Sequence, residues 1–191
     1  MNKPLADRIR PTDLSDVVGQ RHLLSPDKAL YNMIQNGDIP NLIFYGPSGV
    51  GKTTVASIIA NKTKRALRKL NGTNASTPDI RDIVSQLDTF EAPNGILLYL
   101  DEIQYFNKRQ QQSLLEYIEN GKITLIASTT ENPYFYVYSA ILSRSTVFEF
   151  KSVSSEDIIP AVKRGFDFLS KENNIEIDCD DEAVKKIAVG C

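Results

Sequence analysis

The stretch FYGPSGVGKTT, residues 44–54, contains residue types that hold phosphate groups. Gly46, Gly51, Lys52 and Thr53 fit the spacing G-x-x-x-x-G-K-[ST] behind an apolar run. Glycines let successive N–H groups turn toward phosphate oxygens, Lys52 can reach the β- and γ-phosphates, and the Thr53 hydroxyl can ligate Mg²⁺. The spacing predicts a loop that binds a nucleoside triphosphate with Mg²⁺. Its expected binding residues are Gly46, Pro47, Ser48, Gly49, Val50, Gly51, Lys52, Thr53 and Thr54.

Two carboxylates stand at the end of another apolar run. Asp101 and Glu102 directly follow GILLYL, residues 95–100, which contains no charge and reads as a strand buried on both faces. An aspartate at the carboxyl end of such a strand can hold Mg²⁺ through water. The neighbouring glutamate can orient or deprotonate an attacking water, which a small-molecule kinase must exclude. The pair therefore favours hydrolysis over transfer of the phosphoryl group to a metabolite.

Two more polar positions are candidates for work on the γ-phosphate. Thr130 lies in IASTTENP, residues 126–133, and its hydroxyl could contact the γ-phosphate or the attacking water. Ordinary turn chemistry is the alternative for this threonine. Arg144 lies just before a fifth apolar run, where a guanidinium could stabilise the transferring phosphoryl group, often in a neighbouring subunit. A solvated loop arginine is the alternative.

The elements that must position these residues are short apolar runs alternating with segments of helical periodicity. The expected strands are 41–45, 67–70, 95–100, 123–128 and 146–150. This alternation predicts an α/β fold with a parallel sheet flanked by helices, as in P-loop NTPases. Helices are expected after the loop, after an N-cap at Thr77, after a capping box of Asn107 and Gln110, over 155–171, and from Asp180 or Asp181 onward.

Composition narrows the class of protein without identifying it. The chain has 191 residues, 41% hydrophobic and 24% charged, with a net charge of −2, as in soluble globular proteins. There is no global basic field, although a local patch could still bind nucleic acid. Cys179 and Cys191 lack metal-site spacing and are expected to be reduced thiols, as in cytosolic proteins. With no signal peptide and no long apolar run, we expect a soluble intracellular protein that does not enter a membrane.

The order of Gly46–Thr53, Asp101–Glu102, Thr130 and Arg144 resembles the AAA+ ATPases, which carry Walker A, Walker B, sensor 1 and arginine-finger motifs in this order. The segments PLADRIRP, DEIQYFNKRQQ and TTENPYFYVYSAILSRS resemble, within these, the replication-associated recombination protein A family, also called MgsA and related to a Werner-helicase-interacting protein. The resemblance covers essentially the whole chain.

The segment RPTDLSDVVGQRHLL, residues 10–24, is similar to the one that precedes the P-loop in clamp-loader-type AAA+ proteins, where it lies against the adenine. This implies that Val18 and Gly19 lie beside the base. The resemblance also implies an AAA+ core over 1–152, with 1–24 as the adenine-side segment, and the beginning of a truncated helical lid over 153–191. Asn71 is a candidate for the polar residue that restrains the catalytic glutamate in relatives.

The family implies a DNA-dependent ATPase that uses ATP and Mg²⁺, forms a homo-oligomer and acts at replication forks and single-strand/duplex junctions, near single-strand-binding protein. It also implies a bacterial cytoplasmic, nucleoid-associated location. Sensor 2 and the oligomerisation domain of the family lie beyond residue 191, so this fragment is expected to hydrolyse ATP weakly or not at all.

Three other functions remain open at this point: a clamp-loader subunit, a Holliday-junction branch-migration motor, and a non-hydrolysing ATP-dependent scaffold. Glu102 argues against the scaffold, which could dispense with it. Two surface features also remain open. The aromatic run YFYVY, residues 134–138, could stack on bases or pack against protein, and the basic cluster within 62–69 could contact DNA backbone or water.

Overall fold

The computed structural model describes residues 4–87, 89–121, 123–177 and 179–190. Its centre is one sheet of five parallel strands in the order β2-β3-β4-β1-β5. The strands are β1 (Asn41–Tyr45), β2 (Ala66–Asn71), β3 (Ile96–Asp101), β4 (Ile123–Thr129) and β5 (Ser145–Glu149). The predicted α/β class is confirmed, and each strand begins and ends within one residue of its predicted bounds.

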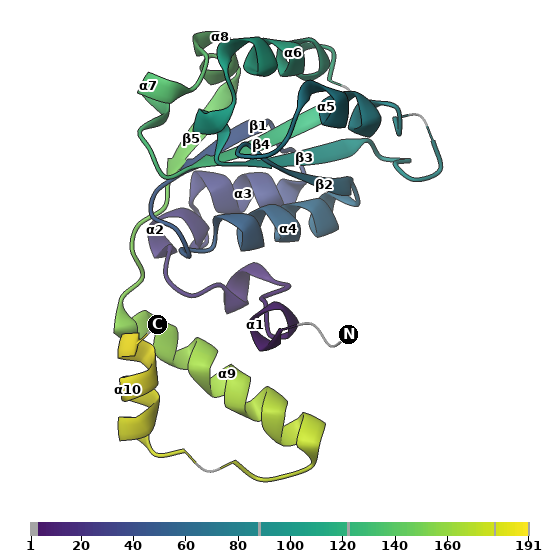
Figure 1. Ribbon diagram of the computed structural model, residues 1–191. Helices are drawn as coiled ribbons and strands as arrows, with labels where there is room; N and C mark the ends of the chain where they lie inside the picture. Colours follow the sequence, from purple (N-terminus) through teal and green to yellow (C-terminus); the bar gives the residue numbers. More distant parts are fainter. Residues whose placement is uncertain (1–3, 88, 122, 178, 191) are drawn as a thin grey trace.

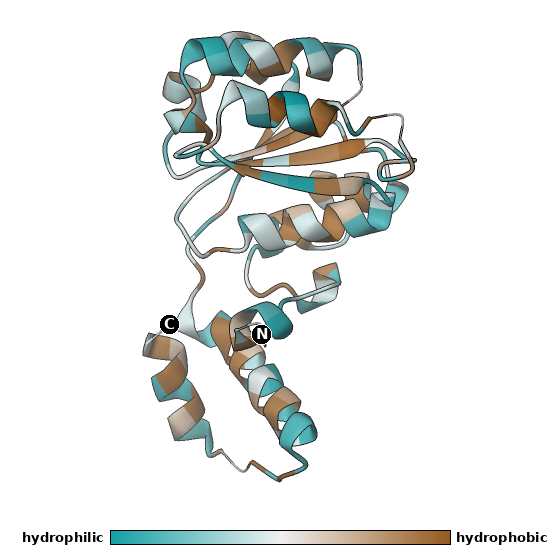
Figure 2. Cartoon of the chain, turned by 45° about the vertical axis from the view of Figure 1, so that its right-hand side comes forward, coloured by the Kyte–Doolittle hydropathy of each residue, from teal (hydrophilic) through white to brown (hydrophobic). Residues whose placement is uncertain are grey.

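Helices cover both faces of the sheet (Figure 1). On one face lie α3 (Ala29–Asn36) and α4 (Lys52–Thr63), and on the other α5 (Thr77–Val84), α6 (Lys108–Glu119) and the short α8 (Ser139–Leu142). Alternation along the strands divides the core in two, because Leu42 and Phe44 pack in the α3–α4 cluster while Ile43 packs in the α5–α6 cluster. Figure 2 shows the resulting hydrophobic colour along the strands between the two helical layers.

Capping residues fix where two of the helices begin. The predicted capping box of α6 is confirmed, with Asn107 accepting from the Gln110 N–H at 3.0 Å and donating its own N–H to the Gln110 side chain at 2.9 Å. The prediction of Thr77 as the N-cap of α5 is wrong. Ser76 is the N-cap, because Asp79 accepts from both its N–H and its hydroxyl, at 2.6 Å each, and so completes a capping box one residue earlier.

Several short helices were not predicted. Besides α3, these are α1 (Leu5–Arg8), η1 (Leu14–Asp16), α2 (Arg21–Leu24), η2 (Ile103–Tyr105), α7 (Pro133–Tyr136) and α8. Most have only three or four residues, too few to repeat a helical hydrophobic pattern, so they depend on contacts with the rest of the fold.

The C-terminal helices α9 (Ser155–Asn173) and α10 (Asp181–Gly190) pack against each other. They lie apart from the sheet, and α1 lies between α9 and the sheet layers (Figure 1). The guanidinium of Arg8 lies 4.8 Å from the centre of the Phe168 ring and also pairs with Glu172. These contacts fasten the N-terminal segment to α9. None of the helices in the described ranges is long and apolar enough to cross a membrane. Cys179 is a free cysteine, as predicted, and Cys191 falls outside the described residues.

Gly46 is the position where the chain leaves β1 and passes close to another backbone. Its φ is +137°, and a Cβ added there would lie 2.0 Å from the carbonyl oxygen of Phe150. Gly46→Ala should therefore lower the free energy of unfolding by roughly 3 kcal/mol or more. Gly37→Ala is the control, because its φ of +74° is strained but no atom lies within 4 Å of the added Cβ. That variant should lose only about 1 kcal/mol, measured by urea unfolding without nucleotide. Equal losses would contradict the steric explanation.

Candidate functional site

The predicted phosphate-binding loop joins β1 to α4. Gly49 and Gly51 have φ values of +78° and +99°, which glycine adopts without steric conflict, and α4 begins directly at Lys52. Lys52 is 7% exposed, and its Nζ donates to the carbonyl oxygens of Gly46 and Pro47 at 2.6 and 2.7 Å. The ammonium group therefore lies inside the loop. Burial lowers the pKa of Lys52, and the nearby carboxylates of Glu102 and Asp101 oppose this shift.

The parallel sheet brings the other candidates to the same edge, because the carboxyl ends of its strands lie side by side. In the ladder, Tyr45 of β1 is opposite Thr129 of β4, and Asn71 of β2 is opposite Asp101 of β3. The N–H of Gly46, which begins the loop, donates to the carbonyl of Thr129 at 3.1 Å. Residues distant in sequence therefore meet around the loop.

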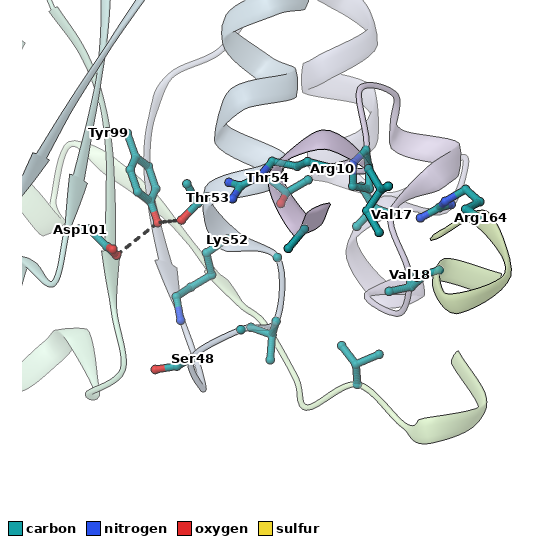
Figure 3. A pocket seen from close by; sticks show the side chains of 18 of the residues that line it. Arg10, Val17, Val18, Ser48, Lys52, Thr53, Thr54, Tyr99, Asp101 and Arg164 are labelled. Carbon is teal, nitrogen blue, oxygen red and sulfur yellow. Dashed lines mark hydrogen bonds between the residues drawn. The ribbon is translucent and has the colours of Figure 1, made fainter. Parts of the chain in front are cut away.

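A pocket of about 430 Å³ lies along this edge and continues to α9. The lining residues shown in Figure 3 include Ser48, Lys52, Thr53 and Asp101 at one end and Val17, Val18 and Arg164 at the other. Glu102 also lines it. The full lining is Ala6, Ile9, Arg10, Pro11, Val17, Val18, Ser48, Gly49, Val50, Gly51, Lys52, Thr53, Thr54, Tyr99, Asp101, Glu102, Val153, Ala161 and Arg164.

Glu102 is held in an unusual backbone conformation at the end of β3. Its φ of +55° lies in the left-handed region, which is uncommon for a residue with a side chain and is often found at functional sites. Its Oε2 accepts from Nε2 of Gln104 at 2.5 Å. Asn71, the candidate from the family resemblance, instead accepts from the N–H and hydroxyl of Thr73 at 2.9 and 2.7 Å. Within the described residues, the side chain that bonds to the Glu102 carboxylate is therefore that of Gln104.

The opposite end of the pocket is mainly apolar. Val18, predicted to lie beside the base, is part of this wall together with Val17. Gly19, predicted with it, is not among the lining residues; it lies against Val153, whose methyl carbons would be 3.2 Å from an added Cβ. The neighbouring Gln20 is 5% exposed, donates to the carbonyl of Lys151 at 2.6 Å and accepts from its N–H at 3.0 Å. Gln20 thereby fixes the N-terminal segment against the chain after β5.

Thr130 and Arg144 lie outside this pocket. Thr130 is exposed at the carboxyl edge of the sheet, directly after β4. Arg144 precedes β5, which runs parallel to β1, so it lies at the opposite edge from the loop. Five strand residues span about 16 Å. Its guanidinium pairs with Glu119 at 2.6 Å. Arg144 is therefore unable to reach the pocket of its own chain.

The donor set fits Mg²⁺ that arrives with a nucleotide rather than a metal held by protein alone. Within the described residues, no group of three or more His, Cys, Asp or Glu could hold a metal ion. Mg²⁺ is usually bound by one or two oxygen ligands from protein together with substrate phosphates and water. The Thr53 hydroxyl and the Asp101 carboxylate line the same pocket and offer oxygen atoms of this kind.

Tyr99 is a site residue that the sequence reasoning missed. It is 2% exposed, and its hydroxyl lies 2.9 Å from Oγ1 of Thr53, 2.9 Å from Oγ of Ser128 and 3.3 Å from Oδ1 of Asp101. Burial raises the pKa of Tyr99 to about 12, so the phenol keeps its proton. The signal was a lone hydroxyl inside the otherwise apolar run GILLYL, two residues before Asp101. Arg10 and Arg164 were also missed, since only the tertiary structure brings them to the pocket.

The aromatic run 134–138 and the basic cluster within 62–69 differ in how far their side chains are engaged by the rest of the protein. In the aromatic run, Tyr134, Phe135 and Tyr136 are 67%, 81% and 50% exposed, whereas Tyr138 packs at the edge of the core. In the basic cluster, the arginines have protein partners. Arg68 donates to Gln86 at 2.5 Å, and Arg65 donates to Thr124.

Comparison with known proteins agrees with this geometry. The family described as "ATPase family associated with various cellular activities (AAA)" matches residues 42–153. Replication-associated recombination protein A of Bacillus subtilis is 40% identical over 99% of this chain, and ATPase WRNIP1 of Dictyostelium discoideum is 36% identical over 97%. The resemblance predicted from the motifs is thereby confirmed. The chain spans only 44% of the Bacillus relative and 21% of the Dictyostelium relative.

A similar fold occurs in a solved structure, the Thermotoga maritima RuvB Holliday junction branch migration motor. The TM-score is 0.71 with 25% sequence identity, over 94% of this chain and 59% of that one.

Proposed function

The chain belongs to the ATPase family associated with various cellular activities (AAA), and on that premise we propose that its pocket binds Mg-ATP and catalyses its hydrolysis. One observation carries the proposal: Lys52, Thr53, Asp101 and Glu102 come from separate segments and line a single pocket. Its other end is apolar and suits a nucleobase. The experiment is calorimetric titration of this chain with ATP and ADP, with Mg²⁺ and with EDTA. Absence of binding under both conditions would refute the proposal.

Each residue has a proposed part in this reaction. The backbone of the loop and Lys52 bind the β- and γ-phosphates, while Thr53 directly and Asp101 through water hold Mg²⁺, which would neutralise charge on the phosphates. Glu102 orients or deprotonates the attacking water. Thr130 contacts the γ-phosphate or that water. Val18, from the N-terminal segment, contacts the base.

We further propose that the chain is divided into two functional parts. The first part, up to residue 152, is the nucleotide-binding core, and its N-terminal residues up to 24 form the base-side segment. The part from residue 153 onward begins a helical lid. The shared lining supports this division, because Val17 and Val18 of the first part and Arg164 of α9 meet in one pocket.

The names of the relatives support a role in DNA replication and recombination. We propose a DNA-dependent ATPase that acts at forks and at single-strand/duplex junctions, beside single-strand-binding protein, in the bacterial cytoplasm near the nucleoid. The test is the ATPase rate of the full-length protein on forked, gapped and blunt duplex DNA. We expect forked or gapped DNA to raise the rate several-fold. A rate indifferent to all three would remove the replication role.

Arg144 is proposed to act on the nucleotide of a neighbouring subunit in a homo-oligomer. Its position at the edge opposite its own loop supports this, and an arginine supplied in trans raises phosphoryl-transfer rates by roughly 10³–10⁵. In the full-length protein, Arg144→Ala should leave ATP binding unchanged and stop turnover. Mixing Arg144→Ala with Lys52→Ala subunits should restore part of the activity, because intact pockets then face intact arginines. No restoration in mixed oligomers would contradict the assignment.

The likeness to the RuvB motor supports a second candidate, branch migration at four-way junctions. Four-way DNA in the same ATPase assay distinguishes this candidate from the fork-acting ATPase. A branch-migration motor should show a larger increase in ATPase rate with four-way DNA than with forked DNA. A clamp-loader subunit would instead require a sliding clamp for full activity. A chain that binds ATP only as a scaffold would show no dependence of turnover on Glu102.

A further inference from the structure

Hydroxyl groups link the P-loop helix to the carboxyl end of β3. Thr53 donates to the Tyr99 hydroxyl, Tyr99 donates to Ser128 or Asp101, and Ser128 donates to Oδ1 of Asp101. Figure 3 shows Tyr99 between Thr53 and Asp101. The connection joins the two residues assigned to Mg²⁺ under the proposed function, and this inference rests on that assignment.

The Asp101 carboxylate at the end of this connection determines which hydroxyl donates each hydrogen bond. An ionised carboxylate only accepts hydrogen bonds, so the proton of Ser128 points toward Asp101. Tyr99 has a single proton, and its acceptors Ser128 and Asp101 are hydrogen-bonded to each other, so they lie on the same side of the phenol oxygen. Its oxygen is therefore left to accept from Thr53. The Thr53 proton then points at Tyr99, and the lone pairs of the Thr53 oxygen are free in other directions.

We propose that Tyr99 is a positioning residue of the magnesium site. Its hydroxyl accepts the hydrogen bond of the Thr53 hydroxyl, so that a lone pair of the Thr53 oxygen is left to face the metal of Mg-ATP. It also ties Thr53 to Asp101, so both protein ligands keep one arrangement before the nucleotide binds. Preorganised ligands strengthen binding because less ordering is needed on association.

Burial makes this hydroxyl hard to replace. Tyr99 is 2% exposed and Ser128 is completely buried, so water has little access to this part of the connection. Without the phenol oxygen, Thr53 loses the acceptor to which it is bonded, and Ser128 loses a donor. A hydrogen bond of this kind contributes about 0.5–1.5 kcal/mol, which corresponds to roughly 2-fold to 12-fold in a binding constant.

The test is Tyr99→Phe, which removes one oxygen and keeps the ring. Calorimetry with ADP, which avoids turnover, gives the dissociation constant in Mg²⁺ and in EDTA. We expect the affinity in Mg²⁺ to fall about threefold to tenfold, with less than a twofold change in EDTA. The control is Tyr31→Phe, a tyrosine that packs at the edge of the same core cluster and does not line the pocket; it should change neither value. Thermal unfolding without nucleotide confirms that each variant is folded.

A double-mutant cycle tests the route through Thr53. Thr53→Val removes the hydroxyl ligand and keeps the shape. If Tyr99 acts through Thr53, Tyr99→Phe should have no further effect on the Mg²⁺ dependence in the Thr53→Val background. Full additivity would overturn the inference, as would an equal loss by Tyr99→Phe in Mg²⁺ and EDTA.

The outcomes also separate this inference from the proposed function. A wild-type chain that binds no nucleotide, or binds without any effect of Mg²⁺, would refute the function. A wild-type chain whose affinity depends on Mg²⁺, together with a Tyr99→Phe variant of identical dependence, would refute only the role of Tyr99.

Discussion

Lys52→Ala should weaken ATP binding by about 100-fold or more. The ammonium is buried in the loop and positioned to make charge-assisted hydrogen bonds to phosphate, each worth about 1.5–3 kcal/mol, and 1.4 kcal/mol corresponds to a factor of ten. Because burial lowers the pKa of Lys52, ATP affinity should also begin to fall at a lower pH than an exposed lysine would give. Calorimetry across a range of alkaline pH values measures both effects.

Lys62→Ala is the control for this prediction. Lys62 lies on the same helix, but its Nζ is directed to Gln35, at 3.3 Å, and to Asp13, at 3.8 Å, rather than to the loop. Its removal should leave ATP binding within about twofold of the wild-type value, since exposed pairs contribute little. If Lys52→Ala bound ATP as tightly as Lys62→Ala, the loop would not be the phosphate site.

Glu102→Gln should separate binding from turnover. The substitution keeps the size of the side chain and removes the base, and a positioned general base contributes about 10²–10⁴ in rate. We expect the ATPase rate of the full-length protein to fall at least about 100-fold, while ATP affinity stays within a fewfold. Single-turnover measurement of phosphate release, beside calorimetry, gives both quantities.

Glu116→Gln provides the matched control, because Glu116 is an exposed residue of α6 away from the pocket lining. It should hydrolyse ATP at the wild-type rate. Equal slow rates for wild type and Glu102→Gln in the presence of DNA would instead favour a scaffold that binds ATP without using it.

Local sequence patterns were sufficient to predict the sheet. Runs such as NLIFY and GILLYL are short and mainly apolar, which favours strands covered on both faces, and Gly and Lys spacing located the loop between β1 and α4. The carboxyl-edge rule for parallel strands then placed Asp101 near the loop, as the structure has it.

What the sequence reasoning missed is of two kinds, side-chain bonds between near neighbours and contacts between distant segments. The cap of α5 is of the first kind, because Asp79 bonds to Ser76 three residues earlier and so makes Ser76, not Thr77, the N-cap. The bond of Gln104 to Glu102 is again local, and it depends on the turn that follows β3. The role of Gln20 is of the second kind, because its side chain bonds to the backbone of Lys151, far away in the sequence. Amphipathic patterns describe faces of single elements and carry no information on such pairings.

The pair of Arg144 and Glu119 bears on the proposed action of Arg144 in a neighbouring subunit, because the guanidinium must leave this pair before it can reach another nucleotide. Both side chains are nearly half exposed, at 43% and 45%, and exposed ion pairs stabilise by only about 0.2–1 kcal/mol. Glu119 therefore holds the guanidinium only weakly, and Arg144 also donates to the carbonyl oxygen of Ala140 at 3.0 Å and to the Ser143 hydroxyl at 3.1 Å. A phosphate group on a neighbouring molecule would therefore replace Glu119 as the partner of Arg144 at a small cost in free energy. Higher salt would weaken the Arg144–Glu119 pair before it weakened the pair of Arg144 with that phosphate.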